Sequence, residues 1–578
     1  MTVRRRSAVC WLAALGMTAA MFALIFLVLD PQYAVNDDSG ILRPFMGFET
    51  GEPAHFHIYL HGLLAWPLHW LGLAAPGVAW LSWMQLAFLF LASAVCQKSI
   101  MQRFAGAKKP LWLGALFALA FTCAFVLPYA TRITFTQTAA LLGAAAVLQI
   151  LSVDHAEASY GAVLRGVGLA LVLLVLAYAL RQVAALPIAC FCGAALLYVA
   201  ARDDGFGRTQ SMKPLAVSVV IAAVVMAGLT GLREWEIDAN GARDYLAWQA
   251  STEDLMDRYG FEGIPQEELD RVGWSANTAA MVGSQWFFLD ESVSTEAFDQ
   301  LTAYIRATRD MSLSARAGEA AQVLAAFPAD NPAAMPSLWL LAAVIVLSAA
   351  GAALLPRDGR FRMLGALLLT VLLATAMLCY LAFDKGRLPL RAALMALLPA
   401  AAMIFGLLPC ALCGRGARAL TALCTAACLG FCAWHLALQL PRLLPDEAHE
   451  AEFGNPVNDL LEYALMNEDM LIIHDITLVG DLRLFPDTSM GIPHNVSYWG
   501  GWSLRSGESI QQFANFGIDL LHFPPETFLR DDVLFATAVV DPPPNHLLNY
   551  LREKVDPNVD CMIYGENGFA YFFQFYIP

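Results

Sequence analysis

Two adjacent aspartates, Asp37 and Asp38, follow the first apolar stretch of the chain, in the sequence YAVNDDSGILRP. Carboxylates beside a bilayer are costly, so an acidic pair in this position indicates a functional site. A carboxylate that is placed next to a reacting hydroxyl can act as a general base, and such bases contribute on the order of 10²–10⁴-fold to a rate. The alternative is a pair that only caps the turn that follows it.

The two neighbours cannot easily share one target, because adjacent side chains diverge by about 100° on a helix and point to opposite sides of a strand. We therefore expect one aspartate to face a substrate and the other to bind backbone or a cation, and we favour Asp37 over Asp38 as the base. A divalent cation on the pair would need further oxygen ligands, which only Glu49 or Glu52 could supply nearby. Metal dependence therefore stays open.

Basic residues at the ends of later apolar stretches could bind a phosphate. Arg387 and Arg391 are four residues apart, on one face of a helix, and Lys385 precedes them. Arg132 and Arg181 stand at the ends of two further stretches. Arginine suits this task because its planar guanidinium binds phosphate oxygens in pairs. The alternative is contact with lipid headgroups.

Histidines and tryptophans form two further candidate groups. The segment HFHIYLH places His55, His57 and His61 at a spacing that could bind zinc, although histidines lying along a membrane surface are the favoured interpretation. In the segment YWGGW, Trp499 and Trp502 could stack on a sugar ring, or they could pack around a glycine turn.

The composition identifies the class of protein. The chain has 578 residues, of which 58% are hydrophobic and 15% charged, and its mean hydropathy is +0.55. These values indicate a polytopic membrane protein. The net charge of −15 arises in residues 441–578, where 21 acidic residues outnumber 6 basic ones by 15. A nucleic-acid partner is excluded because no basic surface is available for it.

Apolar runs of about 18–23 residues match the thickness of a bilayer as helices. The sequence predicts eleven such spans, near residues 8–29, 77–97, 111–128, 137–153, 163–180, 183–201, 214–232, 335–355, 363–383, 389–409 and 419–440. The run Phe56–Leu73 is shorter and contains Pro67 and several histidines. We expect it to lie along the membrane surface as an interfacial helix rather than to cross.

Basic residues decide the orientation, because they concentrate in cytoplasmic loops. With Phe56–Leu73 in the membrane plane, most of them fall on the side of the N-terminus. The N-terminus is therefore predicted to be cytoplasmic, and the C-terminal domain extracytoplasmic. Residues 1–440 then form the transmembrane module, which carries two exterior parts, an acidic loop at 30–76 and a helical loop at 233–334. Residues 441–578 alternate strand-like and helix-like segments, which predicts an exterior α/β domain.

The chain resembles the GT-C class of glycosyltransferases, which take a sugar from a polyprenyl-phosphate carrier. The resemblance rests on NDD at 36–38 in the first exterior loop, on the in-plane segment that follows, and on the exterior C-terminal domain. Within the class, the chain is similar to a group of bacterial membrane proteins through TGEP at 50–53, GRLPLR at 386–391 and NVSYWGGW at 495–502. The resemblance implies a GT-C-like bundle and a catalytic role for the acidic pair, Asp37 and Asp38.

The expected function is an inverting glycosyltransferase of the bacterial plasma membrane. It would move a sugar from a polyprenyl-phosphate donor to a cell-envelope glycan, lipid or protein on the outer face. Lys385, Arg387, Arg391, Arg132 and Arg181 would bind the donor phosphate, opposite the acidic pair and about one sugar away from it. Acceptor or sugar contacts would come from Glu52, His57, His61, Trp499 and Trp502. The alternatives are a secondary transporter of an envelope precursor and a non-catalytic envelope assembly protein. A lipid-diphosphate-dependent polymerase or ligase is the nearest enzymatic alternative.

Overall fold

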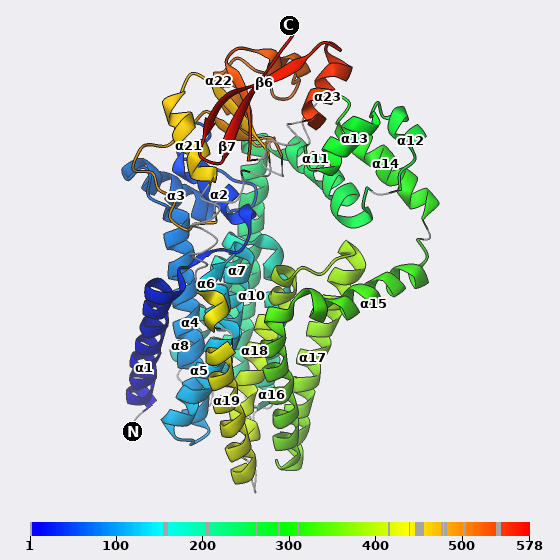
Figure 1. The fold of residues 1–578 in the computed structure, drawn as a ribbon. Helices are drawn as coiled ribbons and strands as arrows, with labels where there is room; N and C mark the ends of the chain where they lie inside the picture. The colour runs from blue at the N-terminus through cyan, green and yellow to red at the C-terminus, as the bar shows by residue number, and fades with distance from the viewer. Residues whose placement is uncertain are drawn as a thin grey trace.

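The computed structural model describes residues 3–578 except 154–159, 203–208, 262, 287–289, 310, 414–416, 439, 445–455, 476–477, 479–481, 501–504 and 539–544. The protein is a helical membrane protein in two parts, a long bundle and a smaller part that carries a sheet (Figure 1). The N-terminus lies at the far end of the bundle, and the C-terminus lies on the sheet-bearing part.

The bundle consists of long apolar helices. They are α1 (Val3–Leu24), α4 (Trp80–Gly106), α5 (Leu111–Phe125), α7 (Phe135–Ser152), α8 (Tyr160–Leu180), α9 (Ala185–Arg202), α10 (Thr209–Ala239), α16 (Met335–Ala353), α17 (Arg357–Lys385), α18 (Leu390–Ala411) and α19 (Ala417–Leu438). Within the described residues, nine helical segments are long and apolar enough to cross a membrane, and two more, Leu111–Phe125 and Leu164–Leu180, are shorter. Each of the eleven predicted spans corresponds to one of these helices.

Helices α7 and α18 form the centre of the bundle and are almost wholly buried. Both are rich in alanine and other small residues, which let helix backbones approach closely in a membrane. Gly406 shows how tight the contact is, because a Cβ atom at this position would lie 2.5 Å from the Leu151 side chain. The central pair therefore forms a rigid support for the loops at its ends.

Short elements cover the head of the bundle. The loop after the first span contains β1 (Gln32–Tyr33), α2 (Asn36–Met46) and α3 (Gly62–Ala74), and β1 pairs with β2 (Arg132–Ile133) beyond α6 (Leu127–Thr131). The second exterior loop contains α11 (Arg243–Glu253), the π-helix η3 (Asp254–Tyr259), α12 (Gln266–Arg271), α13 (Ala276–Gly283), α14 (Thr295–Thr308) and α15 (Leu313–Asp330).

The C-terminal part is a five-stranded mixed sheet in the order β4-β3-β5-β7-β6. Its strands are β3 (Leu471–His474), β4 (Val496–Tyr498), β5 (Val533–Thr537), β6 (Asp560–Asn567) and β7 (Ala570–Tyr576). The helices α21 (Pro456–Met466), α22 (Gly507–Asn515) and α23 (Asn545–Lys554) accompany the sheet. The first three strands are parallel to one another, and β7 runs antiparallel to both of its neighbours.

The second exterior loop and the sheet share one hydrophobic core. Trp248 and Trp274 of the loop belong to the same buried cluster as Trp499, Phe535 and Tyr550 of the sheet-bearing part. The two segments are separated in sequence by spans α16 to α19, so this core joins exterior pieces from distant parts of the chain. We refer to the two segments together as the exterior part, a name that follows the predicted topology.

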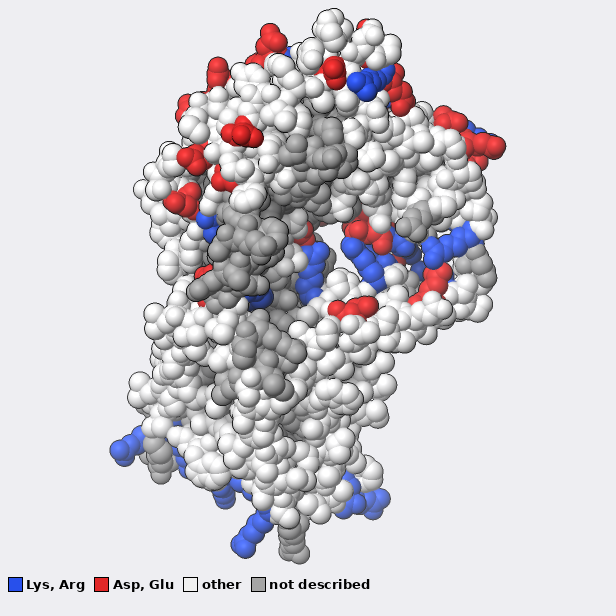
Figure 2. All heavy atoms as spheres, in the orientation of Figure 1, with Lys and Arg blue, Asp and Glu red and all other residues white. Residues whose placement is uncertain are grey.

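Charge is distributed along the long axis (Figure 2). Lys and Arg side chains gather at the end of the bundle that lies away from the sheet, whereas Asp and Glu side chains are frequent on the exterior part. A hollow between the two parts is lined by cations and carboxylates that face one another. The basic end corresponds to the predicted cytoplasmic side.

The predicted interfacial helix differs from the structure at its start. Residues 56–61 are not helical, and α3 begins only at Gly62 and ends at Ala74. The physical reason is that the carbonyl oxygens of His57, Ile58 and Leu60 accept hydrogen bonds from Arg233, so they cannot join a helical ladder. Helix α3 has 13 residues, whereas a helix needs about 20 to cross a membrane.

Candidate active site

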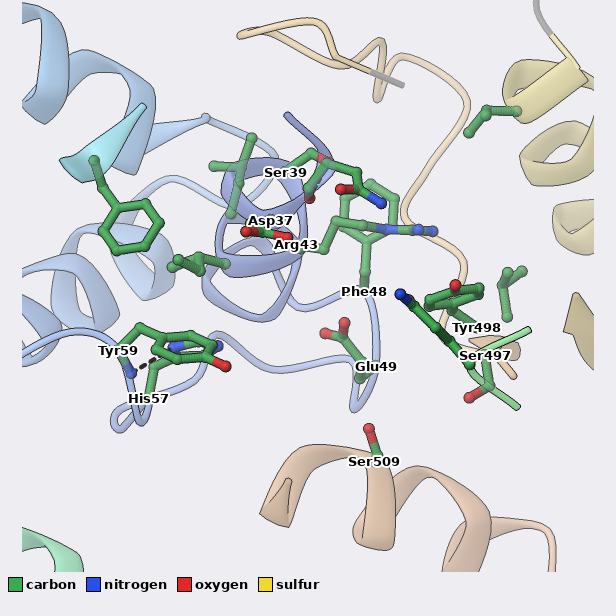
Figure 3. Close-up of a pocket in the computed structure, with 18 of the residues that line it drawn as sticks. Asp37, Ser39, Arg43, Phe48, Glu49, His57, Tyr59, Ser497, Tyr498 and Ser509 are labelled. Atoms are coloured by element: carbon green, nitrogen blue, oxygen red, sulfur yellow. Dashed lines mark hydrogen bonds between the residues drawn. The ribbon is translucent and has the colours of Figure 1, made fainter. Parts of the chain in front are cut away.

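A cavity of about 490 Å³ lies between the head of the bundle and the exterior part. Its walls come from α2 and the loop after it, from α11 and η3, from the loop before α18, and from β4 and α22. Figure 3 shows the side chains that α2, the loop after it, β4 and α22 contribute. The charged side chains among its lining residues are four carboxylates and four guanidinium groups, namely Asp37, Glu49, Glu253, Asp257, Arg43, Arg181, Arg387 and Arg391.

The acidic pair is divided between two environments. Both aspartates lie in the first turn of α2, where negative charge complements the helix dipole. Asp37 faces the cavity, and its Oδ2 forms an ion pair of 2.5 Å with Nη1 of Arg391. Asp38 is wholly buried, and its Oδ1 accepts a hydrogen bond of 2.6 Å from the backbone N–H of Phe135. Only Asp37 can therefore touch a ligand in the cavity.

Asp38 ties α2 to the first turn of α7. Burial raises the pKa of Asp38 to about 8, while the hydrogen bond from Phe135 and an interaction with Gln85 lower that pKa by less. Oδ2 of Asp38 and Oε1 of Gln85 are both buried and lack a hydrogen-bond partner among the described residues. A protonated, neutral Asp38 fits this environment at neutral pH.

The end of α17 and the loop that follows it present cations that are already paired with carboxylates. Arg387 forms an ion pair with Asp257 of η3, and Lys385 binds Oε1 of Glu253 at 2.9 Å. These two acidic residues lie on the exterior part and line the cavity. The structure therefore brings Arg387 to the predicted site and places Lys385 beside it, each with a carboxylate in contact.

Arg181 lies between aromatic rings rather than in an ion pair. Its guanidinium is 4.8 Å from the centroid of the Phe135 ring and 5.5 Å from that of Tyr59. Burial lowers its pKa, and the charge of Asp37 acts in the opposite direction. Its Nε is buried and finds no hydrogen-bond partner among the described residues. The two rings therefore hold the guanidinium, and its Nε–H remains able to donate a hydrogen bond to a ligand.

Glu49 is a second carboxylate of the cavity. The chain reaches it through a turn at Gly47, whose φ of +89° favours glycine, and a Cβ there would lie 3.3 Å from the backbone of Glu52. Burial raises the pKa of Glu49 to about 7, and Arg43 opposes this effect. Oε2 of Glu49 is buried without a hydrogen-bond partner among the described residues. A carboxyl group of this kind can exchange a proton near neutral pH.

His57 and Tyr59 form the wall beside Asp37 (Figure 3). Burial, helped by the charge of Arg233, lowers the pKa of His57 to about 3, so the ring is neutral at physiological pH. Its Nδ1 accepts a hydrogen bond of 3.2 Å from the Tyr59 backbone N–H, which leaves Nε2 as the protonated nitrogen. The Tyr59 hydroxyl accepts a hydrogen bond from Gln249. His57 can therefore donate a hydrogen bond but cannot bind an anion as a cation.

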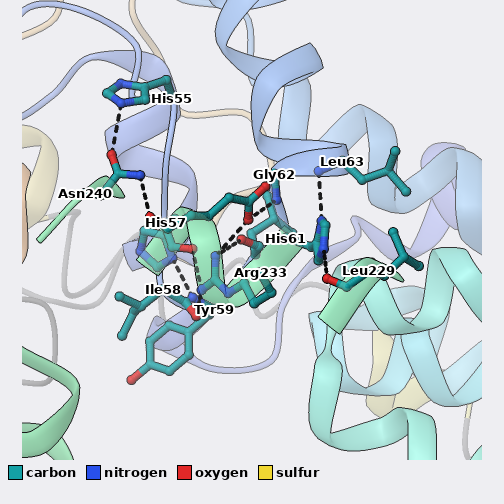
Figure 4. A network of polar contacts seen from close by, with 12 residues as sticks. His55, His57, Ile58, Tyr59, His61, Gly62, Leu63, Leu229, Arg233 and Asn240 are labelled. Carbon is teal, nitrogen blue, oxygen red and sulfur yellow. Dashed lines mark hydrogen bonds and ion pairs between the residues drawn. The ribbon is translucent and has the colours of Figure 1, made fainter. Parts of the chain in front are cut away.

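A buried ion pair holds this wall in position (Figure 4). Arg233 of α10 donates to the carbonyl oxygens of His57 and Leu60, each at 3.2 Å, and to that of Ile58 at 2.5 Å. Its partner Glu236, at 3.4 Å, accepts from the backbone N–H of Gly62 at the start of α3. Both residues are less than 5% exposed.

Replacing Arg233 with methionine should destabilise the protein by about 3 kcal/mol, because the substitution leaves Glu236 buried without its partner. The Arg233→Met, Glu236→Gln double variant should recover part of this loss, since it removes the unpaired charge. Thermal unfolding of the purified variants in detergent measures both effects. Equal stability of Arg233→Met and the unmodified protein would show that the pair does not hold the loop.

Several residues predicted for the site lie elsewhere. Arg132 and Glu52 do not line the cavity, and Arg132 instead donates to the carbonyl oxygen of Asp30 at 3.2 Å. His61 is buried, binds the carbonyl oxygen of Leu229 and caps α3. The predicted contact of Trp499 with a sugar is wrong, because this side chain is 0% exposed. Trp502 lies outside the described residues.

The error at Trp499 has a structural cause. Strand β4 ends at Tyr498, and successive side chains of a strand point to opposite faces of the sheet. Tyr498 faces the cavity, so Trp499 points into the shared core, where it contacts Phe523 at a ring distance of 4.7 Å. The alternation of the apolar residues before it could have indicated this.

Sequence reasoning also missed the acidic residues of the second exterior loop. Glu253 and Asp257 stand in the sequence STEDLMDRYG, whose periodicity predicts a helix and gives no sign of a binding site. Their spacing of four residues puts them on one helix face, which is a weak signal. Burial raises the pKa of Asp257, whereas Arg387 opposes the rise.

The described residues contain no group of three or more His, Cys, Asp and Glu side chains arranged to hold a metal ion. His55 binds Asn240 at 3.2 Å rather than joining His57 and His61 around one point. Glu49 lines the same cavity as Asp37, and Glu52 does not.

Comparisons with known proteins found structural similarity alone. No family model and no curated protein matches the sequence. The structure of ArnT from Cupriavidus metallidurans bound to undecaprenyl phosphate aligns over 96% of both chains, with 13% sequence identity and a TM-score of 0.40. The same protein in its apo state aligns over 98% of both chains, with 12% identity and a TM-score of 0.43. This similarity concerns the arrangement of the chain and assigns no role to any residue.

Proposed function

We propose that this protein is an integral-membrane glycosyltransferase that moves a sugar from a polyprenyl-phosphate carrier to a cell-envelope acceptor on the outer face of the membrane. The observation that carries the proposal is the contact of Asp37 with Arg391 in a polar cavity at the ends of the membrane helices. A general base and an anion-binding group stand side by side there. Transfer from a phosphate-linked sugar needs both groups.

In the proposed reaction, the acceptor hydroxyl gives its proton to the Asp37 carboxylate as its oxygen attacks the anomeric carbon of the sugar. The bond between that carbon and the phosphate oxygen breaks, and its electron pair leaves with the phosphate. Arg391 and Arg181 stabilise the negative charge on the departing polyprenyl phosphate. A direct displacement of this kind inverts the configuration at the anomeric carbon.

Recognition of the acceptor is assigned to the opposite wall. Glu49, Tyr498, Ser497, Ser509 and Gln512 line it, and most of them can donate or accept hydrogen bonds without carrying charge. Such a surface suits a polyhydroxylated acceptor. The proposal thus gives the C-terminal part of the chain a place in the site.

The location of the cavity favours this reaction over transport. Secondary transporters bind substrates near the middle of the bilayer, between discontinuous helices. Here the lining includes α2, the loop between α17 and α18, the first turn of α18 and the exterior part. The buried, unpaired Oε2 of Glu49 also distinguishes the site from the surface of an assembly protein, because such groups cluster at functional sites.

The decisive experiment uses purified protein in lipid nanodiscs with polyprenyl-phosphate sugars. We expect the release of free polyprenyl phosphate, measured by mass spectrometry, to depend on protein and on Asp37. Membranes from the producing cell supply the acceptor. Uptake of the intact sugar carrier into sealed vesicles, with no release of free carrier, would instead indicate a transporter.

A further inference from the structure

Each of the three cations between the end of α17 and the first turn of α18 contacts a carboxylate. Arg391 binds Asp37, Arg387 binds Asp257, and Lys385 binds Glu253. An incoming phosphate that binds the Nη1–Nη2 edge of Arg391 must therefore replace Asp37, whose Oδ2 contacts Nη1. The sequence led us to expect Arg391 a sugar's width away from Asp37, so their direct contact is unexpected.

The contact between Arg391 and Asp37 is suited to exchange. Their side chains are 34% and 37% exposed, and both line the cavity. Ion pairs with this access to water are weak, because solvent screens the attraction. By contrast, the Arg233–Glu236 pair is almost fully buried and serves as a fixed support. The phosphodiester of the donor has two non-bridging oxygens that share one negative charge, and a guanidinium can bind such a pair of oxygens with two N–H groups.

The same contact restrains the proposed base. The ion pair with Arg391 engages Oδ2 of Asp37 and fixes the direction in which the carboxylate points. Arg181 lies close enough to influence both groups, since the charges of Asp37 and Arg391 act on its pKa in opposite directions. A phosphate between Arg391 and Arg181 would contact both cations and leave Asp37 without its partner.

We propose that the carrier phosphate displaces Asp37 from Arg391, so that binding of the donor releases the base for the acceptor. This inference rests on the proposed function and adds regulation to it. Without donor, Asp37 is held by Arg391 and the site is inactive. With donor, the carboxylate turns toward the acceptor wall, and the phosphate occupies the guanidinium.

The test measures binding of undecaprenyl phosphate to the purified protein in nanodiscs, with four proteins. They are the unmodified chain, Asp37→Asn, Arg391→Ala and the double variant. Asp37→Asn removes the competing carboxylate and should tighten binding about fivefold, the scale of an exposed ion pair. Arg391→Ala should weaken binding. In the Arg391→Ala background, Asp37→Asn should produce no further tightening, because the competition has been removed.

Glu52→Gln is the matched control. It removes one negative charge from the same exterior loop but does not line the cavity, so it should leave binding unchanged. Arg391→Lys replaces Arg391→Ala if the latter unfolds, as thermal unfolding would reveal. Binding by Asp37→Asn that equals or falls below that of the unmodified protein would overturn the exchange and leave the proposed function intact. Failure of all folded proteins to bind the lipid would overturn both.

Discussion

Asp37→Asn is expected to lower turnover by about a hundredfold or more, because the substitution keeps the shape of the side chain and removes the base. The side chain is part of the cavity wall rather than of a packed core, so stability should change little. The measurement is the initial rate of carrier release at saturating donor. The loss should appear in kcat, since the contribution of a base arises in the transition state.

Glu49→Gln serves as the comparison, because it also removes a carboxylate from the cavity without a change of size. We expect this variant to raise the KM for the acceptor more than it lowers kcat, as a residue of the acceptor wall should. A hundredfold loss of kcat in Glu49→Gln together with nearly full activity in Asp37→Asn would show that Glu49 is the base and Asp37 is not.

Asp38 should make the protein less stable as pH rises. The pKa of Asp38 in the folded state is about 8, above its ordinary value of 3.8, so folding favours the protonated form. The stabilisation is fully present below pH 3.8 and is lost as pH rises through about 8. The free energy of unfolding should fall by up to about 1.4 kcal/mol for each pH unit within this window.

The Asp38→Asn variant isolates this effect. Its amide resembles the protonated acid, with an oxygen that can accept from Phe135 and an N–H group in place of the acid proton. The measurement is thermal unfolding between pH 7 and 8.5. This range lies above the pKa of Glu49, which is about 7, because the titration of Glu49 also lowers the stability as pH rises. A slope in Asp38→Asn as steep as in the unmodified protein would contradict the assignment.

The bundle could be predicted from the sequence because length and hydropathy alone define membrane helices. The separate positions of Asp37 and Asp38 followed from the geometry of adjacent side chains. Arg391 could be placed at the same level as the acidic loop, because it begins a span on the predicted exterior side. The direct contact between the two residues could not be predicted, since it depends on where the fold places α2 relative to the start of α18.

Other parts of the site depend on contacts between distant segments. Glu253 and Asp257 reach the cavity only because their loop packs on the sheet through Trp248 and its neighbours. The start of α3 was placed six residues too early, because nothing in the local sequence reveals that Arg233, far along the chain, takes its carbonyl oxygens. Local periodicity does not contain such information.

The common core of the second exterior loop and the sheet constrains how this protein can evolve. A C-terminal segment exchanged with that of a relative would meet a loop whose tryptophans were selected to fit another partner. The acidic residues of that loop and Tyr498 of the sheet would then shift together relative to the bundle. Changes in acceptor preference should therefore arise by coordinated substitutions in two segments separated by four membrane helices, rather than by recombination of a detachable domain.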